Sequence, residues 1–352
     1  MSKTITNEEY VEIISSDFKI KNKLAGFDLD NTLIRTKSGK KFSEDSNDWE
    51  FNFNNVIDIL KDYHDNNYCI IIISNQKNLK DNRLSDWVTK VKNIINKINL
   101  PIKVYASIKD NIYRKPNIGF WELIKQKINF VDSFYCGDAM GRRGDHADTD
   151  LKFALNIGLN FKAPETIFQE KFINIPKIKN YFDFQNFTKE ENSYKLGEKE
   201  IIIMIGYPGS GKSTFVRKYL MKSNYEIINQ DKLKSKKKCL TMCEDKMKNN
   251  YNIVIDNTNP DPETRKLYID LGNKYNYTIR CFVMITSEEH SKHNNMYRFL
   301  YQEKEKVPDL VYRIYKKKHK APELSEGFKD IVYIYPEIPS RTNDSKYYFY
   351  LY

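Results

Sequence analysis

Cysteine is scarce in this chain of 352 residues, and long apolar runs are absent. Only five cysteines occur, and an odd, scattered set excludes a disulfide framework and indicates a reducing compartment. They are Cys69, Cys136, Cys239, Cys243 and Cys281. The pair at 239 and 243 stands four residues apart without a histidine nearby, so we expect it to pack in a core rather than to bind zinc.

The sequence also lacks the segments that direct a protein into or across a membrane. The N-terminal stretch MSKTITNEEYVEIISS is too polar for a signal peptide. No apolar run approaches the roughly 20 residues that a membrane helix needs. We therefore expect a soluble, intracellular protein without membrane partners. Its expected place is the nucleus or cytoplasm, or a viral replication compartment if a virus encodes it.

Positive charge outweighs negative charge, with a formal net charge of +11. Such a balance favours polyanionic partners, and nucleic acid is the first of these. A lysine-rich coat on a soluble protein is the alternative explanation, and charge alone does not separate the two. Two lysine runs, residues 232–238 and 316–320, are candidate contacts for DNA phosphates, with a solvated helix face as the alternative for each.

The hydrophobic pattern predicts an α/β fold in two domains, the number that 352 residues favour at about 100–200 residues per domain. Strand-like apolar runs alternate with stretches of helical periodicity. This alternation predicts mostly parallel sheets flanked by helices, with sites at the carboxyl ends of the strands. In the first half the strand-like runs are 23–30, 68–76 and 133–139, and the helical stretches are 53–65 and 84–98.

The same alternation restarts near residue 200. A strand, a glycine turn and a helix occupy 198–220, and further strand-like runs follow at 224–233, 251–261 and 277–286. Residues 188–199 are polar and lack apolar periodicity, so we expect a linker there. The expected domains are 1–187 and 200–352.

The stretch GYPGSGKST, residues 206–214, matches the phosphate-binding pattern G-x-x-x-x-G-K-[ST]. It follows an apolar strand and opens a helix, which is the context that the pattern requires. Backbone N–H groups of such a loop surround the phosphates of ATP at a helix N-terminus. We expect Lys212 to reach the β and γ phosphates and Ser213 to hold Mg²⁺. The expected nucleotide-binding residues here are Gly206, Pro208, Gly209, Ser210, Gly211, Lys212, Ser213 and Thr214.

Charged residues further along suit a kinase. Asp231 follows a strand and is a candidate base for an attacking hydroxyl, with a helix N-cap as the alternative reading. Asp256 ends another strand and suits contact with Mg²⁺ or substrate. Arg265 and Arg298 are candidates for neutralising charge on the phosphoryl group, with a solvated helix face as the alternative for each.

The first half ends an apolar strand with two carboxylates, Asp28 and Asp30. Their charges repel, and a bound Mg²⁺ ion explains why they stand so close. A hydroxyl, a lysine and two more acids follow at or just beyond strand ends: Ser74, Lys115, Asp138 and Asp150. This order predicts hydrolysis of a phosphate ester.

In that reaction Asp28 attacks phosphorus and forms an aspartyl-phosphate. Residues two apart on a strand face the same way, so we expect Asp30 to protonate the leaving oxygen and later to activate water. Ser74 and Lys115 are expected to bind the phosphoryl oxygens. The expected metal ligands are Asp28, Asp30, Asp138 and Asp150 in the first half, and Ser213 and Asp256 in the second.

With these residues identified, the first half resembles the haloacid dehalogenase phosphatase superfamily. The second half resembles P-loop kinases of the polynucleotide kinase type. In this order, and over about residues 20–335, the chain resembles the bifunctional polynucleotide 3′-phosphatase/5′-kinases of DNA repair. The stretches that carry the resemblance are FDLDNTLIRTKSGKKF, ISNQ, YRKPNIGFWE, GDAMGR, DTDLKFALNIGLNF, VIDNTNPDPETRKLYI, HNNMYRF and APELSEGF.

The resemblance implies a Rossmann-like phosphatase domain followed by a P-loop kinase domain, acting as a monomer on DNA strand-break ends. The first would remove a 3′-phosphate with Asp28 as nucleophile and Asp30 as acid and base. The second would move the ATP γ-phosphate to a 5′-hydroxyl with Asp231 as base and Arg265 near the site. A helix near the nucleotide is implied for His293, Asn294, Asn295 and Arg298, and we expect Asn294 and Arg298 to bind ATP.

Three alternatives stay open from the sequence. The same activities could act on RNA ends, the chain could be an inactive module that binds nucleic-acid ends, or it could be a fused pair of small-molecule enzymes. The phosphatase-then-kinase order and the NTNPDPETR stretch favour DNA. The filled nucleophile, base and P-loop positions disfavour the inactive module.

Overall fold

The computed structural model describes residues 2–340 and 345–348, apart from 78, 80, 130, 180, 185, 186, 188 and 189. The chain divides into two compact units, residues 1–180 and Tyr181–Tyr348. This division falls before the expected domain end at 187, because Phe182 and Phe187 contact His290 of the second unit. Of the expected linker, residues 188 and 189 lie outside the described residues. Its Tyr194 and Leu196 pack against the core of the second unit.

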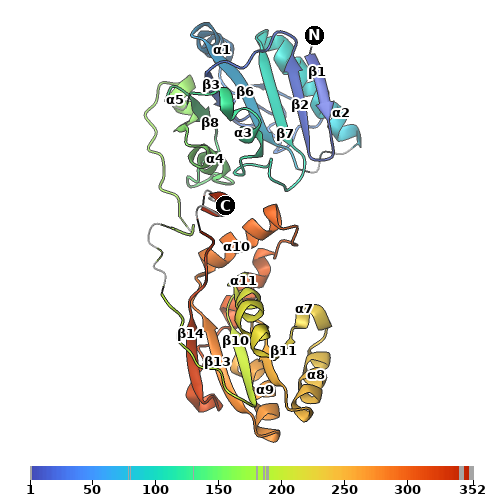
Figure 1. The fold of residues 1–352 in the computed structure, drawn as a ribbon. Coiled ribbons are helices and arrows are strands. Elements are labelled where there is room, and N and C mark those ends of the chain that lie inside the picture. The colour runs from blue at the N-terminus through green and yellow to red at the C-terminus, as the bar shows by residue number, and fades with distance from the viewer. Residues whose placement is uncertain are drawn as a thin grey trace. The chain divides into compact units, whose positions relative to one another are not determined.

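The sheet of the first unit has seven strands in the spatial order β1-β2-β7-β6-β3-β8-β9 (Figure 1). Strands β7, β6, β3, β8 and β9 run parallel, as the alternating pattern predicted. Strands β1 and β2 add an antiparallel edge that the polar N-terminal stretch did not predict. The bounds are β1 (Ser2–Thr6), β2 (Tyr10–Ser15), β3 (Lys23–Phe27), β6 (Tyr68–Asn75), β7 (Ile102–Ser107), β8 (Phe134–Cys136) and β9 (Asn160–Lys162), with a separate pair β4 (Ile34–Arg35) and β5 (Glu50–Phe51).

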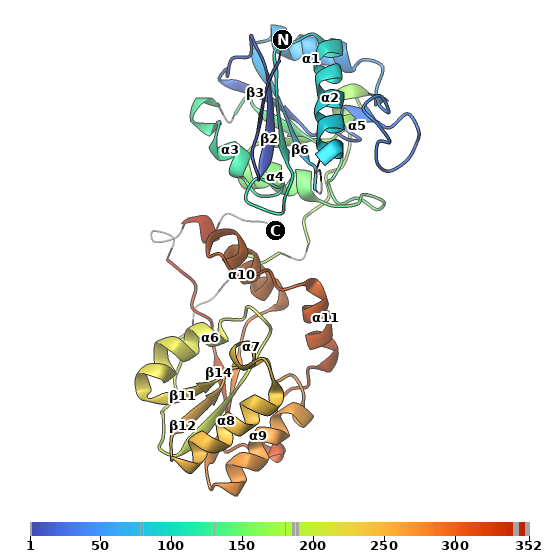
Figure 2. The same cartoon turned by 90° about the vertical axis from the view of Figure 1, so that its right-hand side faces the viewer.

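Helices cover both faces of this sheet (Figure 2). Along β6, Ile70 and Ile72 pack on one face while Ile71 and Ile73 pack on the other, because successive side chains of a strand alternate. The first face is covered by α1 (Val56–Asp65), α2 (Asp81–Ile98) and α5 (Pro164–Phe168). The second is covered by α3 (Gly119–Glu122) and α4 (Thr149–Ile157).

The second unit has a five-stranded, wholly parallel sheet in the order β11-β12-β10-β13-β14. The central strand β10 is buried along its whole length, as its continuous apolar run predicts for a sheet covered on both faces. The bounds are β10 (Glu200–Ile205), β11 (Tyr225–Ile228), β12 (Asn252–Ile255), β13 (Thr278–Met284) and β14 (Asp330–Ile334).

The helices of the second unit also pack on both faces. Ile201 and Ile203 face α8 and α9, whereas Ile202 and Met204 face the helix that begins with α6. Cys239 and Cys243 are buried in the first of these cores, which confirms their packing role. The helices are α6 (Lys212–Phe215), α7 (Gln230–Leu233), α8 (Lys236–Lys248), α9 (Pro262–Lys274), α10 (Glu288–Tyr301) and α11 (Asp309–Lys318). Within the described residues, no helix combines the length and apolar character that crossing a membrane requires.

Candidate active sites

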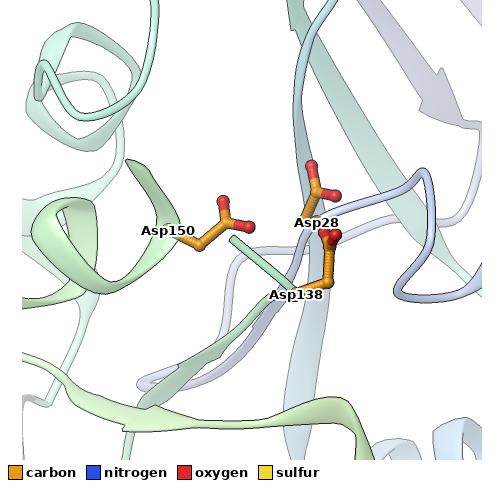
Figure 3. Close-up of side chains that lie close together, drawn as sticks. All are labelled: Asp28, Asp138 and Asp150. Atoms are coloured by element: carbon orange, nitrogen blue, oxygen red, sulfur yellow. The ribbon is translucent and has the colours of Figure 1, made fainter. Parts of the chain in front are cut away.

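Three carboxylates converge at the carboxyl end of the first sheet (Figure 3). Asp28 follows β3, Asp138 follows β8, and Asp150 lies in the first turn of α4. One oxygen of each lies within 4.8 Å of the others. The parallel pairing of β3 with β8 continues past the strand end, since the Asp28 N–H donates to the Cys136 carbonyl at 2.8 Å. The sheet register therefore brings together residues that stand more than a hundred positions apart.

Lys115 lies among these carboxylates. Its ammonium donates to Asp28 Oδ1 at 2.6 Å, to Asp150 Oδ1 at 2.7 Å and to the Tyr135 hydroxyl at 2.8 Å. The side chains of Lys115 and Asp150 are each only 2% exposed. Because an ammonium has three hydrogens, these acceptors use all of them. Lys115 thus neutralises charge beside Asp28, where a transferred phosphoryl group would sit.

The cluster carries more negative charge than one lysine can balance. Burial raises the pKa of Asp28 well above its usual value, and Asp150 and Asp138 add to the rise against the opposing charge of Lys115. Burial and Asp150 raise the pKa of Asp138 to about 6. A divalent cation would relieve this repulsion, and the oxygen donors suit Mg²⁺. Gly137 leaves room for the arrangement, since a Cβ there would lie 2.3 Å from Asp150 Oδ2.

The carboxylate of Asp30 lies outside this three-carboxylate cluster. Strand β3 ends at Phe27, so the two-residue alternation that placed Asp30 beside Asp28 does not continue through it. Gln76 Nε2 instead donates to Asp30 Oδ2 and also to Ser74 Oγ at 2.9 Å. With its oxygen accepting from Gln76, the Ser74 hydroxyl can donate its hydrogen to a phosphoryl oxygen. Sequence reasoning assigned no role to Gln76, although it directly follows the strand end at Asn75.

The P-loop of the second unit is shaped by glycines. Gly211, with φ +97°, caps the helix that begins at Lys212, and Gly209 has φ +80°. A Cβ at Gly209 would lie 2.5 Å from the Ser291 carbonyl oxygen, so only glycine allows α10 to approach the loop. Ser213 and Thr214 lie in the first turn of α6, and Pro208 and Ser210 lie within the loop.

Lys212 folds into this loop. Its ammonium donates to the carbonyls of Gly206 at 2.9 Å and Tyr207 at 2.7 Å. Burial lowers the pKa of Lys212 to about 8; Asp256 opposes this shift and Arg298 adds to it. An anion beside the ammonium would favour its charged form, so the site suits the phosphates of a nucleotide.

Two buried polar atoms near Lys212 lack hydrogen-bond partners among the described residues. They are Asp256 Oδ1, an acceptor, and Arg298 Nε, a donor. Buried polar atoms are rarely left unpaired, so each suits a ligand of complementary charge. The acceptor fits Mg²⁺ or one of its waters, and the donor fits an anion such as a phosphate oxygen.

Asp231 is exposed in α7 and close enough to Lys212 to affect its pKa. The alternative reading of Asp231 as a helix N-cap is wrong, because Asn229 is the N-cap of α7 and its side chain accepts from the Lys232 N–H. The Asn229 amide also donates to the carbonyl and to Oδ2 of Asp256. One side chain therefore fixes both Asp256 and the start of the helix that carries Asp231.

Helix α10 contributes only part of its predicted set to the loop. Asn294 donates to the Gly209 carbonyl at 2.9 Å, and Arg298 influences Lys212 electrostatically. Asn295 instead pairs twice with the backbone of Val307. His293 is buried against the Tyr347 carbonyl at 2.8 Å. The helix thus contacts the P-loop with one face and packs against the rest of the second unit with the other.

The structure corrects the surface interpretation of Arg265 and shows a packing role for this residue. The side chain is fully buried, so it is not on a solvated helix face. Its guanidinium makes a two-armed pair with Glu326 at 2.6 and 2.8 Å and donates to the carbonyls of Asn259 and Lys320. These partners use four of the five N–H donors of the guanidinium, so Arg265 anchors the segment around Glu326 to α9. An arginine in a helical pattern carries no sequence signal that separates these roles.

Both lysine runs are exposed. Lys232, Lys234, Lys236, Lys237 and Lys238 lie on α7, on α8 and in the turn between them. In the second run Lys316 pairs with Glu288 at 3.1 Å. The first run therefore offers more uncompensated charge next to Asp231.

Comparisons with known proteins match both units. Residues 23–168 match the family model described as polynucleotide kinase 3 phosphatase, and residues 201–322 match a model described as an AAA domain. The phosphatase match contains the whole acid cluster, and the second contains the P-loop.

Two relatives match nearly the whole chain, and a third matches part of it. The bifunctional polynucleotide phosphatase/kinase of Schizosaccharomyces pombe is 35% identical over 339 residues, which is 93% of this chain and 83% of that protein. A putative bifunctional polynucleotide phosphatase/kinase of Acanthamoeba polyphaga mimivirus is 34% identical over 379 residues, covering 93% of this chain and 88% of its own length. The polynucleotide 3′-phosphatase of Saccharomyces cerevisiae is 32% identical and covers 40% of this chain and 85% of its own length. The chain therefore belongs to the family of bifunctional polynucleotide phosphatase/kinases, enzymes with a phosphatase domain and a kinase domain.

Proposed function

We propose that this enzyme heals DNA strand breaks by removing 3′-phosphates and phosphorylating 5′-hydroxyls, so that a ligase can join the ends. The observation that carries the proposal is the presence, in one chain, of a buried acid cluster with a lysine and of a P-loop with a nearby carboxylate. Each set lies within a single compact unit, and the second unit displays a lysine run beside that carboxylate. Lysines of this kind bind phosphates without reading sequence, which suits an enzyme that acts on any broken end.

In the phosphatase reaction, a carboxylate oxygen of Asp28 attacks the phosphorus of the terminal phosphate. The bond from phosphorus to the 3′ oxygen breaks, and Asp30 gives its proton to that oxygen. Ser74 donates a hydrogen bond to the phosphoryl group, and Lys115 balances its charge. Water then attacks the aspartyl-phosphate, Asp30 takes the proton of that water, and inorganic phosphate leaves. Mg²⁺ held by Asp28, Asp138 and Asp150 would supply further neutralising charge.

In the kinase reaction, Asp231 takes the proton of the 5′-hydroxyl, whose oxygen attacks the γ-phosphorus of ATP while the bond to ADP breaks. Lys212 and the P-loop hold the phosphates, and Arg298 neutralises charge as it develops. Asn294 orients the loop through Gly209. Ser213 and Asp256 would hold Mg²⁺, which would supply positive charge to polarise the phosphates.

A panel of matched oligonucleotides tests this proposal. DNA and RNA of one sequence, with 3′-phosphate or 5′-hydroxyl ends, are assayed for phosphate release and for phosphorylation from ATP, with EDTA as the metal-free control. We expect both activities on DNA, at least tenfold above those on RNA, and no activity in EDTA. Preference for RNA would point to RNA repair, faster turnover of mononucleotides would indicate small-molecule enzymes, and no turnover at all would leave only an end-binding module.

We further propose that the enzyme acts as a monomer in the nucleus or cytoplasm. Both reactions are assigned to residues of one chain, so neither requires a second copy. Light scattering of the purified protein tests the first point, because a dimer would double the expected mass of 41.8 kDa.

A further inference from the structure

A buried lysine lies next to Asp30. Lys90 on α2 has a side chain only 6% exposed, and its Nζ lies 3.6 Å from Asp30 Oδ1. It also donates to Ser43 Oγ at 3.0 Å. Burying an ammonium is unfavourable unless it gains partners of this kind. Helical spacing places Lys90 on the face of α2 that carries Trp87, Val91 and Ile94, a position normally filled by an apolar residue.

The two oxygens of Asp30 are thus held by different groups. Lys90 faces Oδ1, and Gln76 donates to Oδ2. The side chain of Asp30 is 44% exposed, so packing does little to fix the carboxylate. Contacts on both oxygens restrict rotation of the group about its side-chain bonds. The carboxylate therefore owes its orientation to these two neighbours.

Ser43 links Lys90 to the segment between β4 and β5. Asp48 organises this segment by accepting from the Ser38 N–H, the Ser38 hydroxyl and the Glu44 N–H. Lys90 is therefore held by an ordered loop on one side and faces Asp30 on the other. Its ammonium is placed by α2 and this loop rather than by substrate.

We propose that Lys90 is a positioning residue that holds the Asp30 carboxylate in line with the leaving 3′ oxygen. The inference rests on the proposed role of Asp30 as acid and base. A general acid must lie within hydrogen-bond distance of the oxygen it protonates, and a misplacement of about 1 Å costs roughly a hundredfold in rate. The polar partners described for Lys90 are Asp30 and Ser43, and neither belongs to the acid cluster, so we expect its effect to pass through Asp30.

Leaving-group dependence tests this idea. The 3′ oxygen of DNA is an alkoxide that needs a proton to leave, whereas p-nitrophenolate leaves without one. In K90M we expect kcat/KM for a 3′-phosphorylated DNA oligonucleotide to fall by about 10- to 100-fold, mainly in kcat. For p-nitrophenyl phosphate kcat/KM should change by less than about threefold, since that cleavage does not need the acid. K92M, two residues along α2, is the matched control and should change neither value. Tryptophan fluorescence in a urea titration checks that the first unit of each variant is folded, because all three tryptophans lie in that unit.

Two further variants make the result decisive. S43A removes the anchor of Lys90 without altering α2, and we expect a smaller loss with the same selectivity for DNA. If K90M does not fold, the result for S43A tests the positioning role of Lys90 in its place. Q76L should lower kcat/KM for both substrates, because Gln76 also contacts Ser74. Equal losses on both substrates in K90M and S43A, or no loss, would overturn the positioning role.

D30N separates this inference from the proposed function beneath it. If Asp30 is the acid, D30N should lower kcat/KM by about 10²- to 10⁴-fold for the 3′-phosphorylated DNA oligonucleotide and by far less for p-nitrophenyl phosphate. Equal loss of kcat/KM on the two substrates in D30N would reject the role of Asp30 itself. A selective loss in D30N with an unselective K90M would reject only the role of Lys90.

Discussion

Replacing Lys115 with methionine measures how much one buried cation contributes to the first unit. Lys115 Nζ lies 2.6 Å from Asp28 Oδ1 and 2.7 Å from Asp150 Oδ1, and its side chain is 2% exposed. Methionine keeps much of the volume and removes the charge, which leaves the two carboxylates facing each other in a buried site. Breaking a buried ion pair by removing one partner costs about 3–5 kcal/mol. We expect K115M to lower the free energy of unfolding of the first unit by about this amount when divalent cations are absent.

The assay uses the position of the tryptophans. All three, Trp49, Trp87 and Trp121, belong to the first unit, so their fluorescence in a urea titration reports its unfolding. K125M is the matched control, because Lys125 makes a pair of similar length, 2.7 Å to Glu122, at an exposed position. An exposed pair contributes about 0–1 kcal/mol. The difference in the free energy of unfolding between the two variants therefore measures the effect of burying the ion pair.

Added Mg²⁺ provides the second half of the test. A cation among the carboxylates restores some of the missing charge, so Mg²⁺ should stabilise K115M more than the unaltered protein. Phosphatase activity should be lost while kinase activity persists. The reasoning is refuted if K115M unfolds within about 1 kcal/mol of the unaltered protein in EDTA, or if Mg²⁺ stabilises both equally.

Three further predictions concern independence, packing and pH. D28A should lower phosphate release by more than about 10³-fold and spare kinase activity, while K212A should do the reverse; loss of both activities in either folded variant would contradict separate sites. R265M should lower the free energy of unfolding of the second unit by about 3–5 kcal/mol, measured as loss of kinase activity at a lower temperature. Unchanged stability together with slower phosphorylation would instead indicate a catalytic role for Arg265. Burial lowers the pKa of His290 to about 3, so its stability contribution is complete above pH 6.5 and declines as pH falls towards 3. Between pH 7 and 5 the resulting loss in the free energy of unfolding is roughly 2 kcal/mol. Over that range the stability of H290Q should fall less steeply than that of the unaltered protein.

Local sequence predicted the parts of the fold that depend on short-range pattern. The continuous apolar run of β10 and the glycine turn after it indicate a buried strand and a P-loop, because both depend on neighbouring residues. The N-terminal hairpin of β1 and β2 escaped prediction, since its first strand is largely polar and mostly exposed. The division after residue 180 also escaped it, because aromatic contacts of Phe182 rather than composition decide where the second unit begins.

The candidate sites divide in the same way. Motif order placed Asp28 and Asp138 at strand ends, and the parallel register of β3 with β8 then brings them together. The contacts of Asp30 and Arg265 could not be predicted from local sequence. Asp30 accepts from Gln76, 46 residues away, and Arg265 donates to Glu326, 61 residues away. Lys90 gave one signal, a charge on the apolar face of a helix, but its partner was not visible in that pattern.

The sequence alone determined that this protein has two phosphate-handling units and named candidate residues for their chemistry, because spacing along a strand or around a glycine turn fixes local geometry. Only the tertiary structure decided which side chains form ion pairs, which carboxylates make up the acid cluster and which lysine reaches Asp30. Those contacts join elements distant along the chain, and their distances of 2.6 to 3.6 Å are set by how the sheets and helices pack.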